Sequence, residues 1–198
     1  MPTIYPIDKN IGNLFIMQNK IFIITGQQGS GKTTFLSELI NHLKAEGISV
    51  GGFIAHGFWK DNIRDGFELE DLQTGEKIVL SQSEPVAKWK KFRRFYFNPE
   101  GFKFGEKILS PERSENMDLI AIDEIGPFEL EGKGWRKAID NLIQETNKPM
   151  IWVCRKNILS EIIAEFNLCS FHIYNISQED AEVIAKEIIS KSKHDTPL

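Results

Sequence analysis

The sequence has few cysteines and histidines, which limits the metal and redox chemistry open to it. Among its 198 residues there are two cysteines and four histidines. Cys154 and Cys169 lack the CxxC spacing of zinc or redox sites and lie in apolar, strand-like surroundings, so both are predicted to be buried free thiols. The histidines show no metal-ligand spacing, and no chemistry is assigned to them.

The sequence also lacks a long hydrophobic run and an excess of positive charge. No apolar stretch approaches the ~18 residues that a membrane-spanning helix needs, and the N-terminus does not have the charged and then apolar pattern of a signal peptide. We therefore expect a cytoplasmic protein that does not act in a membrane. The formal net charge of -4 argues against a general nucleic-acid binder.

The most informative stretch directly follows an apolar run that begins at Ile21. It reads Gly26-x4-Gly31-Lys32-Thr33, the spacing of a phosphate-binding loop between a strand and a helix. Glycines in such a loop let successive backbone N–H groups point at the α- and β-phosphates, and the N-terminal end of the helix adds its dipole. The predicted nucleotide-binding residues are Gly26, Gln27, Gln28, Gly29, Ser30, Gly31, Lys32, Thr33 and Thr34.

Two side chains of this loop have specific roles in the prediction. Lys32 can reach the oxygens of the β- and γ-phosphates and is a candidate catalytic residue, and the Thr33 hydroxyl can ligate Mg²⁺. A flexible surface loop is the alternative interpretation. The apolar strand before the loop and the helical pattern after it supply the context that favours phosphate binding.

A second apolar run, from Leu119 to Ile122, ends in two adjacent carboxylates. Ligands of α/β sheets lie at the carboxyl ends of the strands, so Asp123 is predicted to face the phosphate loop and to hold Mg²⁺ together with Thr33. Glu124 is then placed to orient or deprotonate a water molecule, as a catalytic residue. An acidic strand end exposed to solvent is the alternative, and the phosphate loop weighs against it.

Repeated strand and helix patterns predict an α/β fold with a central, mostly parallel β-sheet, flanked by helices on both faces. Residues 49–81 read instead as an antiparallel β insertion, in which Gly51 and Gly52 either allow close approach of another backbone or a ligand, or simply start a strand. Residues 110–114 are predicted to be a polar connection and 125–131 a loop. The last helix is expected at about 178–191, capped by Ser177 with Asp180.

The whole chain, residues 1–198, is predicted to be a single domain. Residues 1–18 are expected to form an N-terminal extension or a hairpin. Residues 192–198 are expected to be a flexible tail.

The stretch from Lys88 to Tyr96 mixes basic and aromatic side chains in a way that leaves two interpretations open. The mixture could hold RNA or single-stranded DNA by stacking and phosphate contact. Phe95 and Phe97 share one face of a strand, however, so half of the aromatics are predicted to be core, and the acidic net charge favours a solvated or phosphate-facing basic edge. Arg93 or Arg94 near the nucleotide is a further hypothesis.

With both motifs in view, Gly26-Gln-Gln-Gly-Ser-Gly-Lys-Thr33 and Asp123-Glu-Ile-Gly-Pro-Phe-Glu-Leu130, the chain resembles the family of small nucleoside-triphosphatases known from thermophiles and from humans. The resemblance covers about Ile21 to Phe166. It implies a P-loop NTPase fold and Mg²⁺-dependent hydrolysis of nucleoside triphosphates, ATP and GTP included, with broad base tolerance. The basic aromatic stretch departs from the family pattern.

The resemblance also implies a role for residues after the next strand. The fold is related to the division of P-loop proteins with a catalytic glutamate, in which that strand lies between the Asp-Glu strand and the P-loop strand. Cys154 and Arg155 would then point at the γ-phosphate, where Arg155 could act as a sensor or as a built-in arginine finger. A surface salt bridge is the alternative for Arg155.

Other functions stay open at this point. A nucleoside or nucleotide kinase would use the same loop with a hydroxyl acceptor in place of water. A nucleotide-binding adaptor, resembling the molybdopterin-guanine dinucleotide biosynthesis accessory proteins, or a nucleic-acid-associated ATPase belongs to a different class, and the Asp123 and Glu124 pair argues against a pure binder. Base specificity and oligomeric state cannot be read from the sequence.

Overall fold

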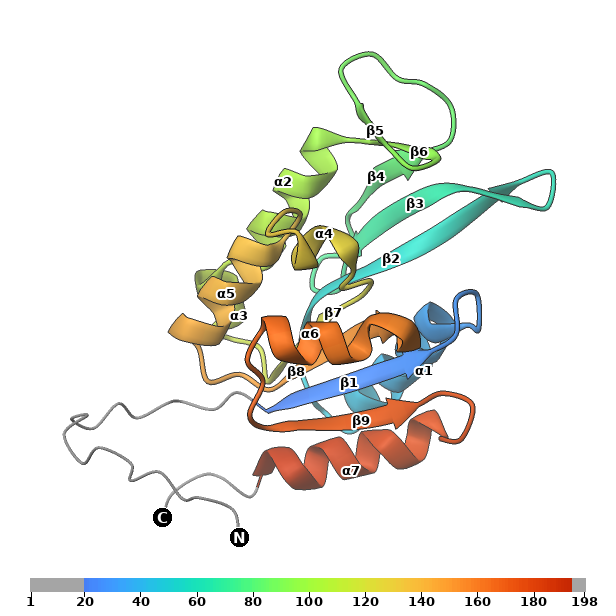
Figure 1. The fold of residues 1–198 in the computed structure, drawn as a ribbon. Coiled ribbons are helices and arrows are strands. Elements are labelled where there is room, and N and C mark those ends of the chain that lie inside the picture. Colours follow the sequence, from blue (N-terminus) through green and yellow to red (C-terminus); the bar gives the residue numbers. More distant parts are fainter. Residues whose placement is uncertain (1–19, 194–198) are drawn as a thin grey trace, which may run out of the picture.

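One nine-stranded sheet organises the computed structural model, which describes residues 20–193. The strand order is β5-β6-β4-β3-β2-β7-β8-β1-β9 (Figure 1). Four strands form a parallel core, in which β8 pairs with β7 and β1, and β1 pairs with β9. These strands are β1 (Ile21–Gly26), β7 (Leu119–Ile122), β8 (Met150–Arg155) and β9 (Phe171–Asn175). Strand β8 lies between β7 and β1, as the resemblance implied.

The other half of the sheet is antiparallel and reaches beyond the parallel core (Figure 1). Strand β2 (Val50–Lys60) belongs to both halves, because it pairs in parallel with β7 and antiparallel with β3 (Ile63–Asp71). The antiparallel strands continue with β4 (Lys77–Gln82), and β5 (Lys90–Phe92) and β6 (Phe95–Phe97) then form a short hairpin at the edge. The predicted antiparallel insertion beside a parallel core is therefore confirmed, but the antiparallel strands continue beyond residue 81 to Phe97 and make up half of the sheet.

Helices cover both faces of the sheet, as predicted. Helices α1 (Lys32–Ala45) and α7 (Ala181–Lys193) pack on one face, and α2 (Pro99–Ile108), α5 (Arg136–Glu145) and α6 (Leu159–Glu165) pack on the other. Alternate residues of β1 and β8 enter the two cores, with Ile23 and Trp152 on one side and Phe22 on the other. The central parallel strands β1, β7 and β8 are buried on both faces, which explains their apolar sequences, whereas the edge strand β9 is partly exposed.

Short helices replace two of the predicted connections. Helix α3 (Pro111–Ser114) follows Ser110, whose side chain accepts a hydrogen bond from the Arg113 amide, and helix α4 (Pro127–Leu130) lies in the predicted loop after β7. A 3₁₀ turn, η1 (Lys156–Ile158), follows β8. Helices α3 and α4 each begin at a proline, which is a helix-start signal that the sequence carries.

The start of α7 also differs from the prediction. Asp180 caps the helix by accepting hydrogen bonds from the Glu182 and Val183 amides, whereas Ser177 donates its own amide and hydroxyl to Asn175 in a turn. The helix runs on through residues 192 and 193, so the predicted flexible tail does not begin at 192. The extension or hairpin predicted for residues 1–18 lies outside the described residues.

Two smaller predictions have clear outcomes. Cys154 is buried, but Cys169 is exposed and its thiol lies near the Asn167 carbonyl, so the prediction of a second buried thiol is wrong. Gly52 does provide close backbone approach. It has a φ of 93°, and a Cβ atom there would lie 1.9 Å from the Ala121 carbonyl oxygen of β7.

Candidate active site

The phosphate loop joins the end of β1 to the start of α1, as predicted. Gly29 and Gly31 have φ angles of 75° and 91°, in the left-handed region that only glycine adopts without strain. These two turns bring the chain from the strand into the helix within five residues. The amides of the first helical turn have no partner within the helix, so the loop presents donors to an anion.

The Lys32 side chain folds over this loop. Only 6% of the residue is exposed, and its Nζ donates to the Gln27 carbonyl oxygen at 2.8 Å and lies 3.4 Å from that of Gly26. Burial lowers the pKa of Lys32, and the neighbouring Glu124 carboxylate opposes this effect. The loop carbonyls therefore hold the ammonium group close enough to Glu124 to feel its charge, and in this position it could neutralise a phosphate group bound on the loop.

Asp123 is the first residue after β7 and is completely buried. Its Oδ2 accepts a hydrogen bond from the Ala55 amide of β2 at 3.2 Å, while its Oδ1 has no hydrogen-bond partner in the described part of the chain. Burial, followed by the charge of Glu124, raises the pKa of Asp123, and the Thr33 side chain lies near enough to oppose that rise. The two predicted metal ligands, Thr33 and Asp123, are thus brought together although they lie far apart in the sequence.

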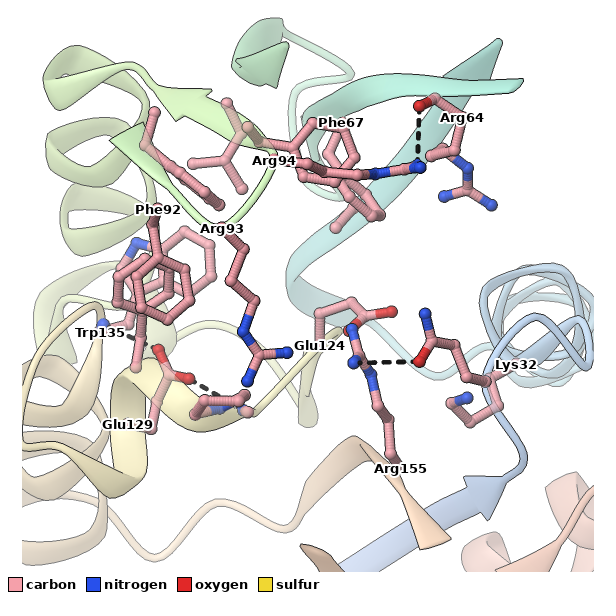
Figure 2. Close-up of a pocket in the computed structure, with 18 of the residues that line it drawn as sticks. Lys32, Arg64, Phe67, Phe92, Arg93, Arg94, Glu124, Glu129, Trp135 and Arg155 are labelled. Carbon is pink, nitrogen blue, oxygen red and sulfur yellow. Dashed lines mark hydrogen bonds and ion pairs between the residues drawn. The ribbon is translucent and has the colours of Figure 1, made fainter. Parts of the chain in front are cut away.

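Glu124 occupies a strained position at the same edge of the sheet. Its φ is 63°, which is uncommon for a residue with a side chain, and the Ile125 amide anchors the turn by donating to the Val153 carbonyl oxygen at 2.9 Å. The carboxylate is partly exposed and Arg155 Nη2 lies 3.7 Å from its Oε2 (Figure 2). The Ile125 hydrogen bond therefore maintains the strained turn that places the carboxylate at the open end of the parallel strands.

Arg155 ends β8 and contacts both motifs. Besides its ion pair with Glu124, its Nη1 lies 3.5 Å from Oε1 of Gln28 in the phosphate loop. The salt bridge that the sequence left as an alternative does exist, but its partner is the predicted catalytic carboxylate. Arg155 is consequently part of the site and not of a separate surface.

Sequence reasoning missed Glu129, which shapes the wall of the site. This carboxylate is 2% exposed and accepts hydrogen bonds from the Gly126 amide at 2.9 Å and the Trp135 amide at 3.2 Å. Burial raises the pKa of Glu129 to about 7. The spacing of Gly126, Pro127 and Glu129 is that of a capped helix start, so the sequence did carry a signal for this contact.

A cavity of about 520 Å³ opens beside these residues and extends toward the β5–β6 hairpin (Figure 2). Lys32, Glu124 and Arg155 line one end, and Arg93 and Arg94 line the other, which supports the hypothesis of an arginine of this segment near the nucleotide. Phe95 and Phe97 both line the cavity, and Phe97 also packs against Phe102 and Phe128. Of the segment's aromatics, Phe92, Phe95 and Phe97 line the cavity, and Phe97 is also packed against the hydrophobic core. No helix within residues 20–193 is long and apolar enough to span a membrane.

Known proteins that are similar to this chain in sequence include nucleoside-triphosphatases. A family model described as NTPase matches residues 21–189. A nucleoside-triphosphatase THEP1 of Archaeoglobus fulgidus is 32% identical over 168 residues, which is 83% of this chain and 94% of that protein. A nucleoside-triphosphatase THEP1 of Methanocaldococcus jannaschii is 29% identical over 175 residues, with 87% and 96% covered.

Two solved structures share the fold. The solution structure of a human cancer-related nucleoside triphosphatase superposes with a TM-score of 0.66 at 21% identity, covering 90% of this chain and all of that one. The crystal structure of THEP1 from the hyperthermophile Aquifex aeolicus gives the same TM-score at 24% identity, covering 88% and 99%. At these identities the likeness supports the fold alone.

Proposed function

The chain belongs to the NTPase family whose model spans residues 21–189, and from that premise we propose that it hydrolyses nucleoside triphosphates, ATP and GTP among them, to diphosphate and phosphate. One observation carries the proposal. Asp123 and Glu124 leave the carboxyl end of β7 beside Lys32 of the phosphate loop, with Glu124 close enough to act on its pKa. A phosphate group on the loop would therefore meet a cation and a carboxylate together.

Residues 26–34 hold the triphosphate in this proposal. Their backbone amides bind the α- and β-phosphates, and Lys32 neutralises charge on the β- and γ-phosphates. Phosphoryl transfer needs positioning and charge stabilisation more than covalent chemistry, so these groups supply most of what the reaction requires.

Mg²⁺ fits the residues beside the loop. Asp123 Oδ1 is buried and has no hydrogen-bond partner in the described residues, which is costly for a carboxylate unless a cation binds there. Asp123 and Thr33 would hold the ion, and, when bound, Mg²⁺ neutralises charge on the phosphate oxygens. Residues 20–193 contain no cluster of three or more His, Cys, Asp or Glu side chains suited to a metal, and Mg²⁺ typically takes only one or two carboxylates with phosphates and water.

Glu124 activates the water in this proposal. The anchored turn after β7 places the carboxylate at the open end of the strands, and its side chain is partly exposed, so it can accept a proton from a water molecule. Arg155 lies within 3.7 Å of that carboxylate and points from the tip of β8 toward the same space (Figure 2). We assign Arg155 to stabilising negative charge on the γ-phosphate.

A phosphate-release assay tests the proposal. Purified protein is given ATP, GTP, CTP or UTP with and without Mg²⁺, beside Lys32→Ala. The proposal requires Mg²⁺-dependent release of one phosphate per triphosphate by the wild type and a loss of at least 100-fold in Lys32→Ala. Release that is equal in both proteins would reject it.

The cytoplasmic location stays a prediction.

A further inference from the structure

The cavity beside the γ-phosphate position carries more positive charge than hydrolysis by water requires. Besides Lys32 and Arg155, three arginines line it: Arg64, Arg93 and Arg94. Within residues 20–193, none of these three forms an ion pair with a carboxylate. The carboxylates Glu124 and Glu129 line the same cavity, but these three guanidinium groups outnumber them and form no ion pair in this part of the chain, an arrangement that favours an anionic ligand.

Arg64 is held in one orientation by its surroundings. Its guanidinium lies over the Trp59 ring at 4.3 Å and over the Phe67 ring at 5.0 Å from the ring centroids. The guanidinium group also packs against Gly57, and a Cβ atom at that position would lie 1.8 Å from Arg64 Nη1, so any larger residue there would displace it. Its Nε is buried with no partner among the described residues. An arginine that is already held in one orientation loses little conformational entropy when it binds a ligand.

Arg93 and Arg94 come from the tip of the β5–β6 hairpin. Arg93 has a φ of 53°, and its side chain extends from the hairpin into the space between Glu129 and Glu124 (Figure 2). Arg94 runs toward β3, where its Nη2 donates to the Arg64 carbonyl oxygen at 2.8 Å. The three guanidinium groups thus approach the site from the side opposite the phosphate loop.

Aromatic rings form the rest of the wall at this end. Phe92 packs on Phe128 with ring centroids 4.4 Å apart, and Phe95 packs edge-on against Phe67 at 5.6 Å. All four rings line the cavity. A lining of apolar rings with a few convergent cations suits a ligand that has a planar ring and a phosphate group. The cavity volume of about 520 Å³ is within the range of small-molecule binding sites.

We propose that this end of the cavity binds a nucleoside monophosphate, and that the monophosphate accepts the γ-phosphoryl group of the triphosphate. The arginines contact its phosphate and the phenylalanine rings contact its base. The inference rests on the proposed function in one respect, because the triphosphate must lie on residues 26–34 with its γ-phosphate toward Glu124 and Arg155.

The transfer balances without a further reactant. An oxygen of the monophosphate forms a bond to the γ-phosphorus, and the bond from that phosphorus to the bridging oxygen breaks. The electron pair of the broken bond leaves with the nucleoside diphosphate, so two nucleoside diphosphates result. A phosphate monoester with a second pKa of about 6 is largely doubly ionised at pH 7 and needs no base. The arginines would offset the repulsion between the two phosphate groups.

Binding and transfer are measured separately on the full chain. Calorimetry with AMP, GMP, CMP and UMP is carried out with Mg²⁺ and a non-hydrolysable ATP analogue present. Arg93→Ala is expected to weaken binding of the best monophosphate at least tenfold. Lys91→Ala removes an equal charge from the same hairpin, but Lys91 lies over Tyr96 and outside the cavity, so it should change that affinity less than twofold.

Two further comparisons test whether the site recognises the base of the monophosphate as well as its phosphate group. Ribose 5-phosphate should bind at least tenfold more weakly than the best monophosphate, because it lacks the ring. Phe95→Leu, which removes a ring but keeps apolar volume, should weaken the monophosphate and leave ribose 5-phosphate within twofold. It also serves as the second variant if Arg93→Ala fails to fold.

Transfer is followed by chromatography of GTP mixed with AMP, where ADP and GDP should form in equal amounts beyond the hydrolysis background. The inference is overturned if no monophosphate binds the wild type, or if one binds but yields no diphosphate. It is also overturned if Arg93→Ala weakens the triphosphate as much as the monophosphate, since the triphosphate would then fill the cavity itself. Phosphate release without any monophosphate tests hydrolysis separately, so either claim can fail alone.

Discussion

Replacing Glu129 should remove a pH dependence of folding that its carboxyl group creates. The side chain is 2% exposed, and burial raises its pKa from 4.5 to about 7, although the Gly126 and Trp135 amides donate to it and oppose the rise. In Glu129→Gln the group no longer titrates, and its carbonyl oxygen can still accept one of the two amide hydrogen bonds.

The sign follows from where the proton is held. The folded protein keeps the Glu129 proton up to about pH 7, whereas the unfolded chain releases it near 4.5. Between these values the folded state binds more protons, so the free energy of unfolding falls as the pH rises. The contribution is fully present below about pH 4.5 and lost above about pH 7. A rise from 4.5 to about 7 corresponds to on the order of 3 kcal/mol.

Urea unfolding from pH 4.5 to 8, followed by tryptophan fluorescence, measures this effect. The free energy of unfolding of the wild type, minus that of Glu129→Gln, should fall by on the order of 3 kcal/mol over the window. Glu131→Gln is the control, because Glu131 lies just after α4 in an exposed ion pair with Lys133. A difference that stays flat with pH for Glu129→Gln would refute the assignment of a buried, protonated carboxyl group.

Three further predictions test the site and the sheet. Gly52→Ala should destabilise the protein by about 3 kcal/mol or more in urea unfolding, because the new Cβ atom would clash with the β7 backbone. Gly75, with a φ of 74° and open space around it, is the control, and Gly75→Ala should destabilise the protein by only about 1 kcal/mol. Equal destabilisation in the two variants would contradict the clash. Arg155→Ala should lower kcat about 10³-fold in phosphate-release assays, and a loss below threefold would remove it from the mechanism. Asp123→Asn should raise the Mg²⁺ concentration for half-maximal activity at least tenfold, and an unchanged Mg²⁺ titration would exclude Asp123 as a ligand.

Much of the parallel core could be predicted because its signals are local. The strand before the phosphate loop and the strand ending at Asp123 are apolar on both faces, and the glycine spacing between Gly26 and Gly31 is set by the anion it binds. Parallel strands all end at one edge, so the two motifs had to meet there. The structure places them together, with Arg155 of the intervening strand between them.

Apart from the hypothesis of Arg93 or Arg94 near the nucleotide, the second end of the cavity could not be predicted, because it depends on contacts between distant strands. Arg64 owes its position to Gly57 and Trp59 across the β2–β3 pair, and no spacing in the sequence marks that packing. The hairpin that carries Arg93 has strands of only three residues each, too short for an alternating pattern to show which side faces the site. Glu129 was missed because its burial comes from the loop around it.

Glu124→Gln gives the most direct test of the central claim, that the carboxylate after β7 activates water at a triphosphate held by residues 26–34. Calorimetry with Mg²⁺ and ATP and a single-turnover phosphate assay are run on the same preparation, beside the wild type. We predict an unchanged or tighter ATP affinity and a loss of at least 100-fold in turnover, because the amide keeps the shape of the side chain but cannot take a proton. Full turnover in Glu124→Gln would contradict the account.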